Sequence, residues 1–439
     1  MWCSKAELTA RSEALHRLLS VTKPLWEPRP FEHPAPPWTE SHSELTAFLD
    51  ALDDDALGTL EADPDALRHA LAPWLPTLPA AASLDALPWL GPDPSQSPPT
   101  AIPARKAGQI EAFLRALETL GPPAGSAVDW CAGKGHLSRA LAERFGLAVR
   151  ALEKELHLIA AGEHLAEGQQ ISFEAEDVLA RPIALEPGEH LCALHACGGL
   201  HDAALQSFSR SDGSQLFLAP CCYALHRPHG GEWRGWARSS PAIQLDSHAL
   251  RLAAADLATA PAGVRARRTR ELVLRQAFDL FQRDTFDRDA YLPCPSMPPA
   301  IIDRGFEAFA AQAAAHHGLA LPTQLDGDRW MAAGAKRAAR VRRRNLLRLA
   351  FGRVLELRIV LDRALWLAEQ GFAVSLITFC DRALTPRNLL LSARSAQRAP
   401  KHREKGPEYI PWNESRGIFA PRSQRPDLAG SCTRASSPR

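Results

Sequence analysis

A short stretch at residues 128–142, "VDWCAGKGHLSRALA", combines residue types that suit ligand binding. An apolar run ends at Asp129, and Gly133 and Gly135 follow before a helical pattern begins. Glycines leave out the Cβ atoms where a backbone must approach a ligand closely, and the start of a helix offers free N–H groups. The pattern is typical of a strand, turn and helix that hold a nucleotide-like cofactor.

The glycine spacing narrows the choice of cofactor. A triphosphate-binding loop is excluded, because it needs a glycine in place of Val128 and a serine or threonine in place of Gly135. A dinucleotide-binding turn fits in part, since Gly133, Gly135 and Ser138 supply two glycines and a small residue. An adenosyl-binding turn fits as well, with Asp129 placed to meet an ammonium group. The turn alone does not decide between these two cofactors.

Two further acids follow the next two predicted strands. Glu153 ends the strand expected at 147–153, where a carboxylate can accept hydrogen bonds from both hydroxyls of a ribose. Asp177, which precedes Val178, ends the strand expected at 171–177, where it can accept a hydrogen bond from an adenine amino group. Because the carboxyl ends of parallel strands meet at one edge of a sheet, these residues and the glycine turn predict one ligand site.

A second set of chemically active residues follows the fourth and fifth predicted strands. His195 and Cys197 lie in "LHACGGL", and Cys221, Cys222 and Tyr223 lie in "APCCYAL". His195 is the best candidate for removing a proton, and the other four are candidate catalytic residues expected to face the same cleft. A metal site is not expected, because the cysteines form no CxxC pair and adjacent cysteines rarely ligate one ion.

A parallel sheet must bring these residues together, and the apolar pattern predicts one. Apolar runs alternate with helical segments from residue 106 onward, which favours an α/β fold with a Rossmann-like sheet of seven strands. Well over a hundred residues separate the fifth strand from the last helix, so a large insertion before the last two strands is expected. The predicted division is an N-terminal helical region and linker at 1–100, the first part of the core at 101–225, an inserted substrate-recognition subdomain at 226–352, the last helix and two strands at 353–396, and a disordered tail at 397–439.

Together these motifs resemble class I S-adenosylmethionine-dependent methyltransferases. Asp129 with its glycines, then Glu153 and Asp177, are similar to the first three motifs of that family. The "AGKG", "HACG" and "CCY" motifs resemble a branch that includes tRNA 2'-O-methyltransferase-like domains and methyltransferase domains associated with glutathione-transferase-like proteins. The resemblance covers about 105–225 and 355–395.

The resemblance implies S-adenosyl-L-methionine as the cofactor and methyl transfer as the reaction. It places Cys131, Lys134 and His195 in the cofactor site, although the family usually has glycine where Cys131 stands. The family's signature for methylating exocyclic amines is replaced by "APCCY", so methylation of such an amine is not indicated. Direct transfer to an oxygen or to another nitrogen remains, and its catalysis consists mostly of positioning the acceptor against the methyl group. A nucleophilic role for Cys221, as in methylation of a base at carbon, stays open.

Basic residues suggest the substrate. Residues 330–348 carry seven Lys or Arg and no acid, and a second basic cluster lies at 264–275. These clusters favour an anionic substrate such as RNA, either tRNA or rRNA. A protein or small-molecule substrate, a non-catalytic RNA-binding or assembly factor, and a nicotinamide dehydrogenase remain alternatives. The proposed substrate-binding residues, spaced to form one stripe on a helix, are Arg340, Arg343, Arg344 and Arg348.

Composition sets the remaining expectations. The net charge of +1 gives no global preference for nucleic acid or for a membrane, and no apolar run reaches membrane-spanning length. Nine cysteines, including an adjacent pair, favour reduced thiols and a cytoplasmic location. The oligomeric state is left open by the sequence.

Overall fold

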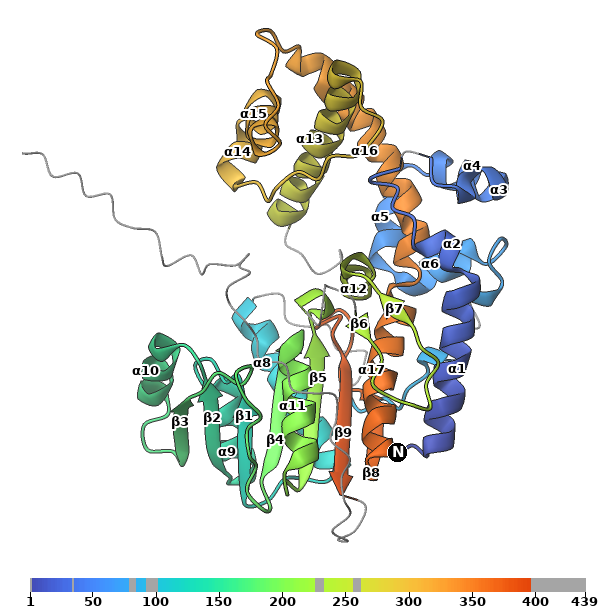
Figure 1. Ribbon diagram of the computed structural model, residues 1–439. Helices are drawn as coiled ribbons and strands as arrows, with labels where there is room; N and C mark the ends of the chain where they lie inside the picture. The colour runs from blue at the N-terminus through green and yellow to red at the C-terminus, as the bar shows by residue number, and fades with distance from the viewer. Residues whose placement is uncertain are drawn as a thin grey trace, which may run out of the picture.

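The computed structural model describes residues 2–33, 35–78, 84–91, 102–225, 233–255 and 262–395. The tail at 397–439, which the sequence predicts to be disordered, lies outside these ranges. Figure 1 shows a central sheet, an N-terminal group of helices beside its β8 end, and a helical insert beyond the carboxyl ends of β4 and β5.

Seven strands form one sheet in the order β3-β2-β1-β4-β5-β9-β8. Strands β1 to β5 are parallel, and β9 is antiparallel to both β5 and β8. This confirms the predicted α/β fold with a mostly parallel sheet. The strand order reverses between β1 and β4, which is where open sheets of this kind bind ligands. The bounds are Ser126–Trp130 (β1), Ala148–Glu153 (β2), Ile171–Ala175 (β3), His190–Cys197 (β4), Gln215–Cys221 (β5), Phe372–Thr378 (β8) and Leu389–Ser395 (β9).

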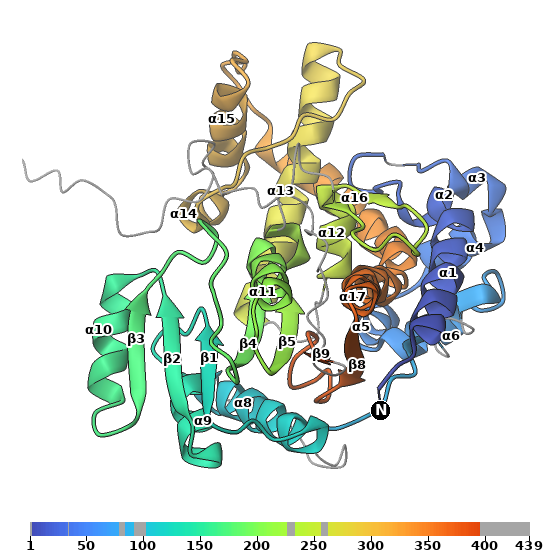
Figure 2. The ribbon, with the colours of Figure 1, turned by 60° about the horizontal axis from the view of Figure 1, so that its bottom comes forward.

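Helices cover both faces of the sheet because successive strand residues point to opposite sides. Val128 belongs to one apolar core and its neighbour Ala127 to the other, and the same holds for Leu218 and Phe217. Helices α8 and α9 lie together on the Ala127 face (Figure 2), whereas α11 and α17 cover the Val128 face. Helix α10 packs on β3. The bounds are Ile102–Leu120 (α8), His136–Phe145 (α9), Leu156–Leu165 (α10), Gly199–Arg210 (α11) and Gly352–Glu369 (α17).

The N-terminal helices pack against the last part of the chain. Helix α1 lies along α17, and α2, α4, α5 and α6 contact α16 (Gly327–Leu349). Leu15, Leu45 and Leu71 are fully buried in the same core as α17, which explains the helical spacing of apolar residues in this region. The bounds are Lys5–Val21 (α1), Lys23–Trp26 (α2), Trp38–Ser41 (α3), Ser43–Ala51 (α4), Asp54–Ala62 (α5) and Pro64–Leu71 (α6).

The segment between β5 and α17 contains a small core of its own. Phe278, Phe281, Phe306 and Trp330 are buried together where α13, α15 and α16 meet. Within the described residues, no helix has the length and apolar character that crossing a membrane requires. The bounds are Trp233–Arg234 (β6), Gln244–Leu245 (β7), Ser247–Ala253 (α12), Ala262–Phe286 (α13), Pro299–Asp303 (α14), Phe306–His316 (α15) and Gly327–Leu349 (α16).

Candidate active site

The turn after β1 is built around Asp129. Asp129 is buried, and the hydroxyl of Ser138 in α9 donates to its Oδ2 atom at 2.6 Å. Burial raises the pKa of Asp129 to about 6, although the hydrogen bond from Ser138 favours the ionised form. Gly135 has a φ of 66°, and a Cβ there would lie 2.6 Å from the Phe173 ring. Only glycine satisfies both requirements, so the turn's spacing has a steric cause.

Cys131 adopts a backbone conformation that is normally left to glycine. Its φ is 60°, which costs a non-glycine residue on the order of 1–3 kcal/mol. This accounts for the glycine usual at this position in the family that the sequence resembles. Burial raises the pKa of the Cys131 thiol, and the nearby carboxylates of Glu153, Asp129 and Asp177 add to the effect. A neutral thiol therefore lies among the three predicted cofactor-binding acids.

Glu153 and Asp177 connect the next two strands to this turn. Glu153 accepts a hydrogen bond from Gly133 N at 2.8 Å through Oε2, and its Oε1 accepts from the backbone of Lys154 at 2.9 Å. The Oδ2 atom of Asp177 lies 3.0 Å from Lys154 Nζ. Val178 is buried beneath, while Lys134 is exposed to solvent. The structure thus gathers the acids at one sheet edge.

A pocket of about 440 Å³ opens between this turn, α8 and the loop that follows β8. That volume falls in the range of small-molecule sites. Of the residues singled out in the sequence, Asp129, Cys131 and His195 line the pocket. Sequence reasoning missed the contribution of α8, because its periodicity identifies an amphipathic helix without showing which polar residues meet the sheet edge. The lining residues that it missed include Arg105, Lys106, Gln109, His136 and Thr385.

His195 is aimed by a bulge in β4. The register with β5 shifts between Leu194 and Ala196, and His195 has a φ of 63°. Its Nε2 atom lies 3.0 Å from Gln109 Oε1, while Gln109 Nε2 donates to Leu384 O at 3.0 Å. Because the Gln109 amide donates to Leu384, its oxygen accepts from Nε2–H and leaves Nδ1 as the basic nitrogen. Burial lowers the pKa of His195, so the neutral imidazole predominates at pH 7.

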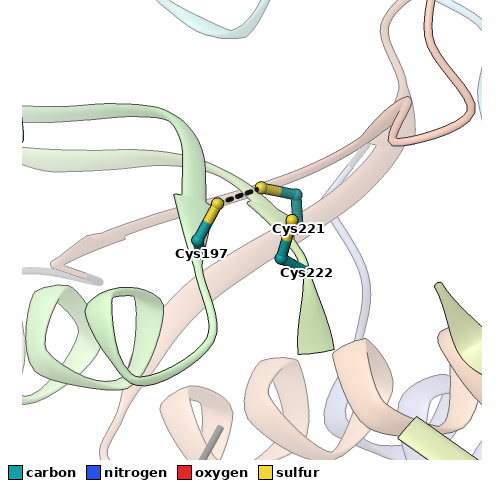
Figure 3. A group of neighbouring side chains, drawn as sticks. All are labelled: Cys197, Cys221 and Cys222. Carbon is teal, nitrogen blue, oxygen red and sulfur yellow. Dashed lines mark hydrogen bonds between the residues drawn. The ribbon is translucent and has the colours of Figure 1, made fainter. Parts of the chain in front are cut away.

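Three cysteines meet at the ends of β4 and β5 (Figure 3). Cys197 and Cys221 are register partners, and their sulfur atoms are 2.9 Å apart. Both thiols also lie within hydrogen-bonding reach of His195 O, at 3.4 Å from Cys197 and 3.2 Å from Cys221. Cys222 is exposed, and hydrogen bonds from the Cys197 and Cys221 thiols lower its pKa. The sequence predicted that these cysteines face one cleft, but it did not predict direct contact between thiols that are 24 residues apart in sequence.

The structure corrects the placement of Tyr223. Tyr223 lies in the single turn η1 (Tyr223–Leu225), is 1% exposed, and donates to Glu356 Oε1 of α17 at 3.2 Å. The expectation that it faces the cleft is therefore wrong, because its side chain points into the core between the sheet and α17. It is not a candidate catalytic residue.

The arginine stripe of α16 is also corrected. Arg344 pairs with Asp50 of α4 at 2.7 Å, Arg348 donates to Trp26 O at 2.8 Å, and Arg343 donates to Leu52 O. These three arginines hold the N-terminal helices and do not form a free surface for a substrate. Arg340 alone of the four is exposed. The helical spacing was right, but the partner of this face is the chain's own N-terminal region.

Comparison with known proteins agrees with the geometry over the first part of the core. Residues 105–228 match a family model described as a methyltransferase domain. A similar curated protein is a glutathione S-transferase C-terminal domain-containing protein homolog from Drosophila pseudoobscura pseudoobscura, 28% identical over 148 residues. That match covers 32% of this chain and 25% of the relative, so the chain spans about a quarter of that relative's length.

Solved structures give weaker likenesses. A methyltransferase in complex with its activator Trm112 from Haloferax volcanii has 18% sequence identity and a TM-score of 0.22, covering 27% of this chain and 57% of that one. The amino pentose methyltransferase CalS10 from Micromonospora echinaspora, solved with S-adenosylmethionine bound, has 18% identity and a TM-score of 0.23, covering 30% and 56%. The family-model match assigns residues 105–228 to a methyltransferase domain, the enzyme class expected from the sequence.

Proposed function

We propose that this chain is a methyltransferase that transfers a methyl group from S-adenosylmethionine directly to an oxygen or nitrogen atom of RNA. The observation that carries the proposal is the pocket in which Asp129 and His195 come together from β1 and β4, at the point where the strand order reverses. Protein and small-molecule substrates are the rivals of RNA.

The residues present fit the cofactor. Buried Asp129 has Ser138 as its hydrogen-bond donor and lines the pocket, so an ammonium group would complement its charge. Glu153 Oε1 accepts from the backbone of both Lys154 and Glu155, whereas Oε2 accepts one backbone hydrogen bond, from Gly133 N, and retains a lone pair that suits a ribose hydroxyl. Asp177 and Val178 are assigned to the adenine. A Cβ on Gly133 would meet no atom within 4 Å, so the backbone there is open to close approach.

His195 is assigned the role of accepting a proton from the methyl acceptor. S-adenosylmethionine supplies an electrophilic methyl group when bound. The protein's part is to hold the acceptor in line and to take its proton at His195 Nδ1, while Gln109 fixes the ring at Nε2. The buried, neutral imidazole suits this role at pH 7.

The support for RNA as the substrate comes from exposed basic residues outside the arginine stripe of α16. The first turns of α13 carry Arg267 and Arg268, both exposed, and α13 begins at the end of the insert nearer the sheet (Figure 1). Arg105 and Lys106 add positive charge to the pocket lining. Cations at both places would contact the phosphates of a strand entering the pocket. We place the protein in the cytoplasm, in keeping with eight described cysteines that are all free thiols.

The test is methyl transfer from labelled donor into fractionated lysate by the full-length chain, followed by nuclease or protease digestion. We expect nuclease-sensitive label with the unaltered chain and no label with Glu153→Ala. Glu155→Ala is the matched control, because Glu155 is exposed and should leave transfer unchanged. Protease-sensitive label would replace RNA by a protein substrate. Binding of S-adenosylhomocysteine without transfer to any fraction would favour a non-catalytic RNA-binding or assembly factor.

A further inference from the structure

The three-cysteine cluster is the strongest unassigned feature of the molecule. The sulfur atoms of Cys197, Cys221 and Cys222 all lie within 4.8 Å of one another at the carboxyl edge of β4 and β5 (Figure 3). The methyl-transfer role proposed for the pocket uses none of these thiols.

The backbone is shaped to bring the thiols together. Cys197 and Cys221 are paired in register on adjacent parallel strands, so their side chains share one face. In a regular strand Cys222 would point to the opposite face from Cys221. Its φ of 49° breaks that alternation and brings its thiol to the same side. A left-handed conformation costs a non-glycine residue on the order of 1–3 kcal/mol, so the surrounding structure must hold Cys222 in this turn.

Although the sequence spacing predicted no metal site, this backbone turn brings the adjacent thiols to one side, and we propose that Cys197, Cys221 and Cys222 bind one Zn²⁺ ion as three thiolate ligands, with a fourth position open to an exchangeable ligand. Thiolates are the ligands that Zn²⁺ prefers, and tetrahedral coordination with Zn–S of about 2.3 Å places sulfur atoms about 3.8 Å apart. The sulfur atoms of Cys197 and Cys221 are 2.9 Å apart, and all three sulfur atoms lie within 4.8 Å of one another, which is compatible with that value. Small side-chain rotations therefore complete the site.

The surroundings favour an open site over a closed structural one. Among the residues that the structure describes, no histidine, aspartate or glutamate joins the three thiols as a further ligand. Cys221 is buried and Cys222 is exposed, so the fourth position faces the solvent side.

The first measurement is zinc binding by the reduced, full-length chain. We expect one Zn²⁺ per chain, and a thiolate-to-metal charge-transfer band after replacement by Co²⁺. Cys197→Ser and Cys222→Ser should each weaken Zn²⁺ binding at least about tenfold in competition with a chromophoric chelator. Cys294→Ser is the matched control, because Cys294 is partly buried in the insert, away from the cluster, and its replacement should change nothing.

A second measurement works without variants that could fail to fold. Bound Zn²⁺ should slow alkylation of Cys222 in the unaltered chain, read by peptide mass mapping, and should leave alkylation of Cys294 unchanged. Substoichiometric zinc, equal affinity in the cluster variants, or equal alkylation of Cys222 with and without Zn²⁺ would each overturn the proposal. A chain prepared without reductant that lacks two free thiols and binds no zinc would instead identify a Cys197–Cys221 disulfide. None of these readouts depends on methyl transfer, so this inference and the proposed function can fail separately.

Discussion

Three residues at neighbouring strand ends share an unusual backbone state. Cys131, His195 and Cys222 have φ values of 60°, 63° and 49°; Cys131 and Cys222 directly follow β1 and β5, and His195 lies at the bulge near the end of β4. Left-handed conformations of non-glycine residues persist only when the surrounding structure over-determines them, and they cluster at functional sites. Here each one redirects a side chain at the carboxyl edge of the sheet. The strain is therefore concentrated where the pocket and the thiol cluster lie.

The pKa of Asp129 predicts a pH-dependent cofactor affinity. Because burial raises this pKa from 3.8 to about 6, the carboxyl group becomes neutral as the pH falls through 6 and can no longer pair with an ammonium group. We expect affinity for S-adenosylhomocysteine to fall between pH 7 and 5, measured by calorimetric titration. Asp129→Asn should bind weakly at both values, with this pH dependence removed.

Loss of cofactor affinity at low pH can be told apart from acid unfolding, because protonation of Asp129 has the opposite effect on stability. The folded chain holds the Asp129 proton more tightly than the unfolded chain does, since the folded-state pKa is the higher one. Protonation of this group between pH 6 and 3.8 therefore favours the folded state. An affinity that stays constant from pH 7 to 5 in the unaltered chain would contradict the assignment of Asp129 to the ammonium group.

At the scale of elements, helix α16 joins parts of the chain that are distant in sequence. One end packs with α13 in the core of the insert, and the other meets α2, α4, α5 and α6. Its arginines supply the specific contacts, since Arg344 pairs with Asp50 and Arg342 pairs with Glu61 of α5. The basic segment of α16 therefore connects the insert to the N-terminal helices through contacts within the chain.

This arrangement predicts unequal effects of two neighbouring arginines on stability. Arg344→Ala removes a buried side chain together with its ion pair to Asp50 and should lower the free energy of unfolding by about 1–3 kcal/mol. Arg340→Ala, at an exposed position of the same helix, should change it by no more than about 0.5 kcal/mol. Urea denaturation followed by circular dichroism measures both. Equal losses in the two variants would show that Arg344 contributes only helix propensity.

At the scale of the whole molecule, the insert lies beyond the sheet edge that carries the pocket (Figure 1). Its exposed arginines at the start of α13 and the cations of α8 lie on separate elements, one in the insert and one in the core. An extended anionic chain would engage both sets of cations, whereas a small molecule in the pocket would meet only those of α8. This is the physical basis for preferring RNA to a small molecule.

Charge reversal on α13 tests that preference. Arg267→Glu together with Arg268→Glu should weaken RNA binding and reduce the slope of log affinity against log salt by about one to two. Arg17→Glu is the control, because Arg17 is equally exposed on α1, which packs along α17, and should have little effect. Filter binding at salt concentrations from about 50 to about 200 mM measures both the RNA affinity and its salt slope. Unchanged affinity and slope in the double variant would remove the argument for RNA.

The sequence by itself determined the sheet and the edge at which we propose that the cofactor binds. Alternating apolar runs, the turn at 128–142, and acids at the ends of successive strands are local patterns, and the carboxyl ends of parallel strands must meet. Only the tertiary structure decided which side chains from distant parts of the chain contact these residues. The side chains of Gln109 and Tyr223, the partners of the α16 arginines and the meeting of three thiols depend on which distant elements pack together. Periodicity shows that a face is buried or basic, but the identity of its partner is set by long-range packing that spacing does not encode.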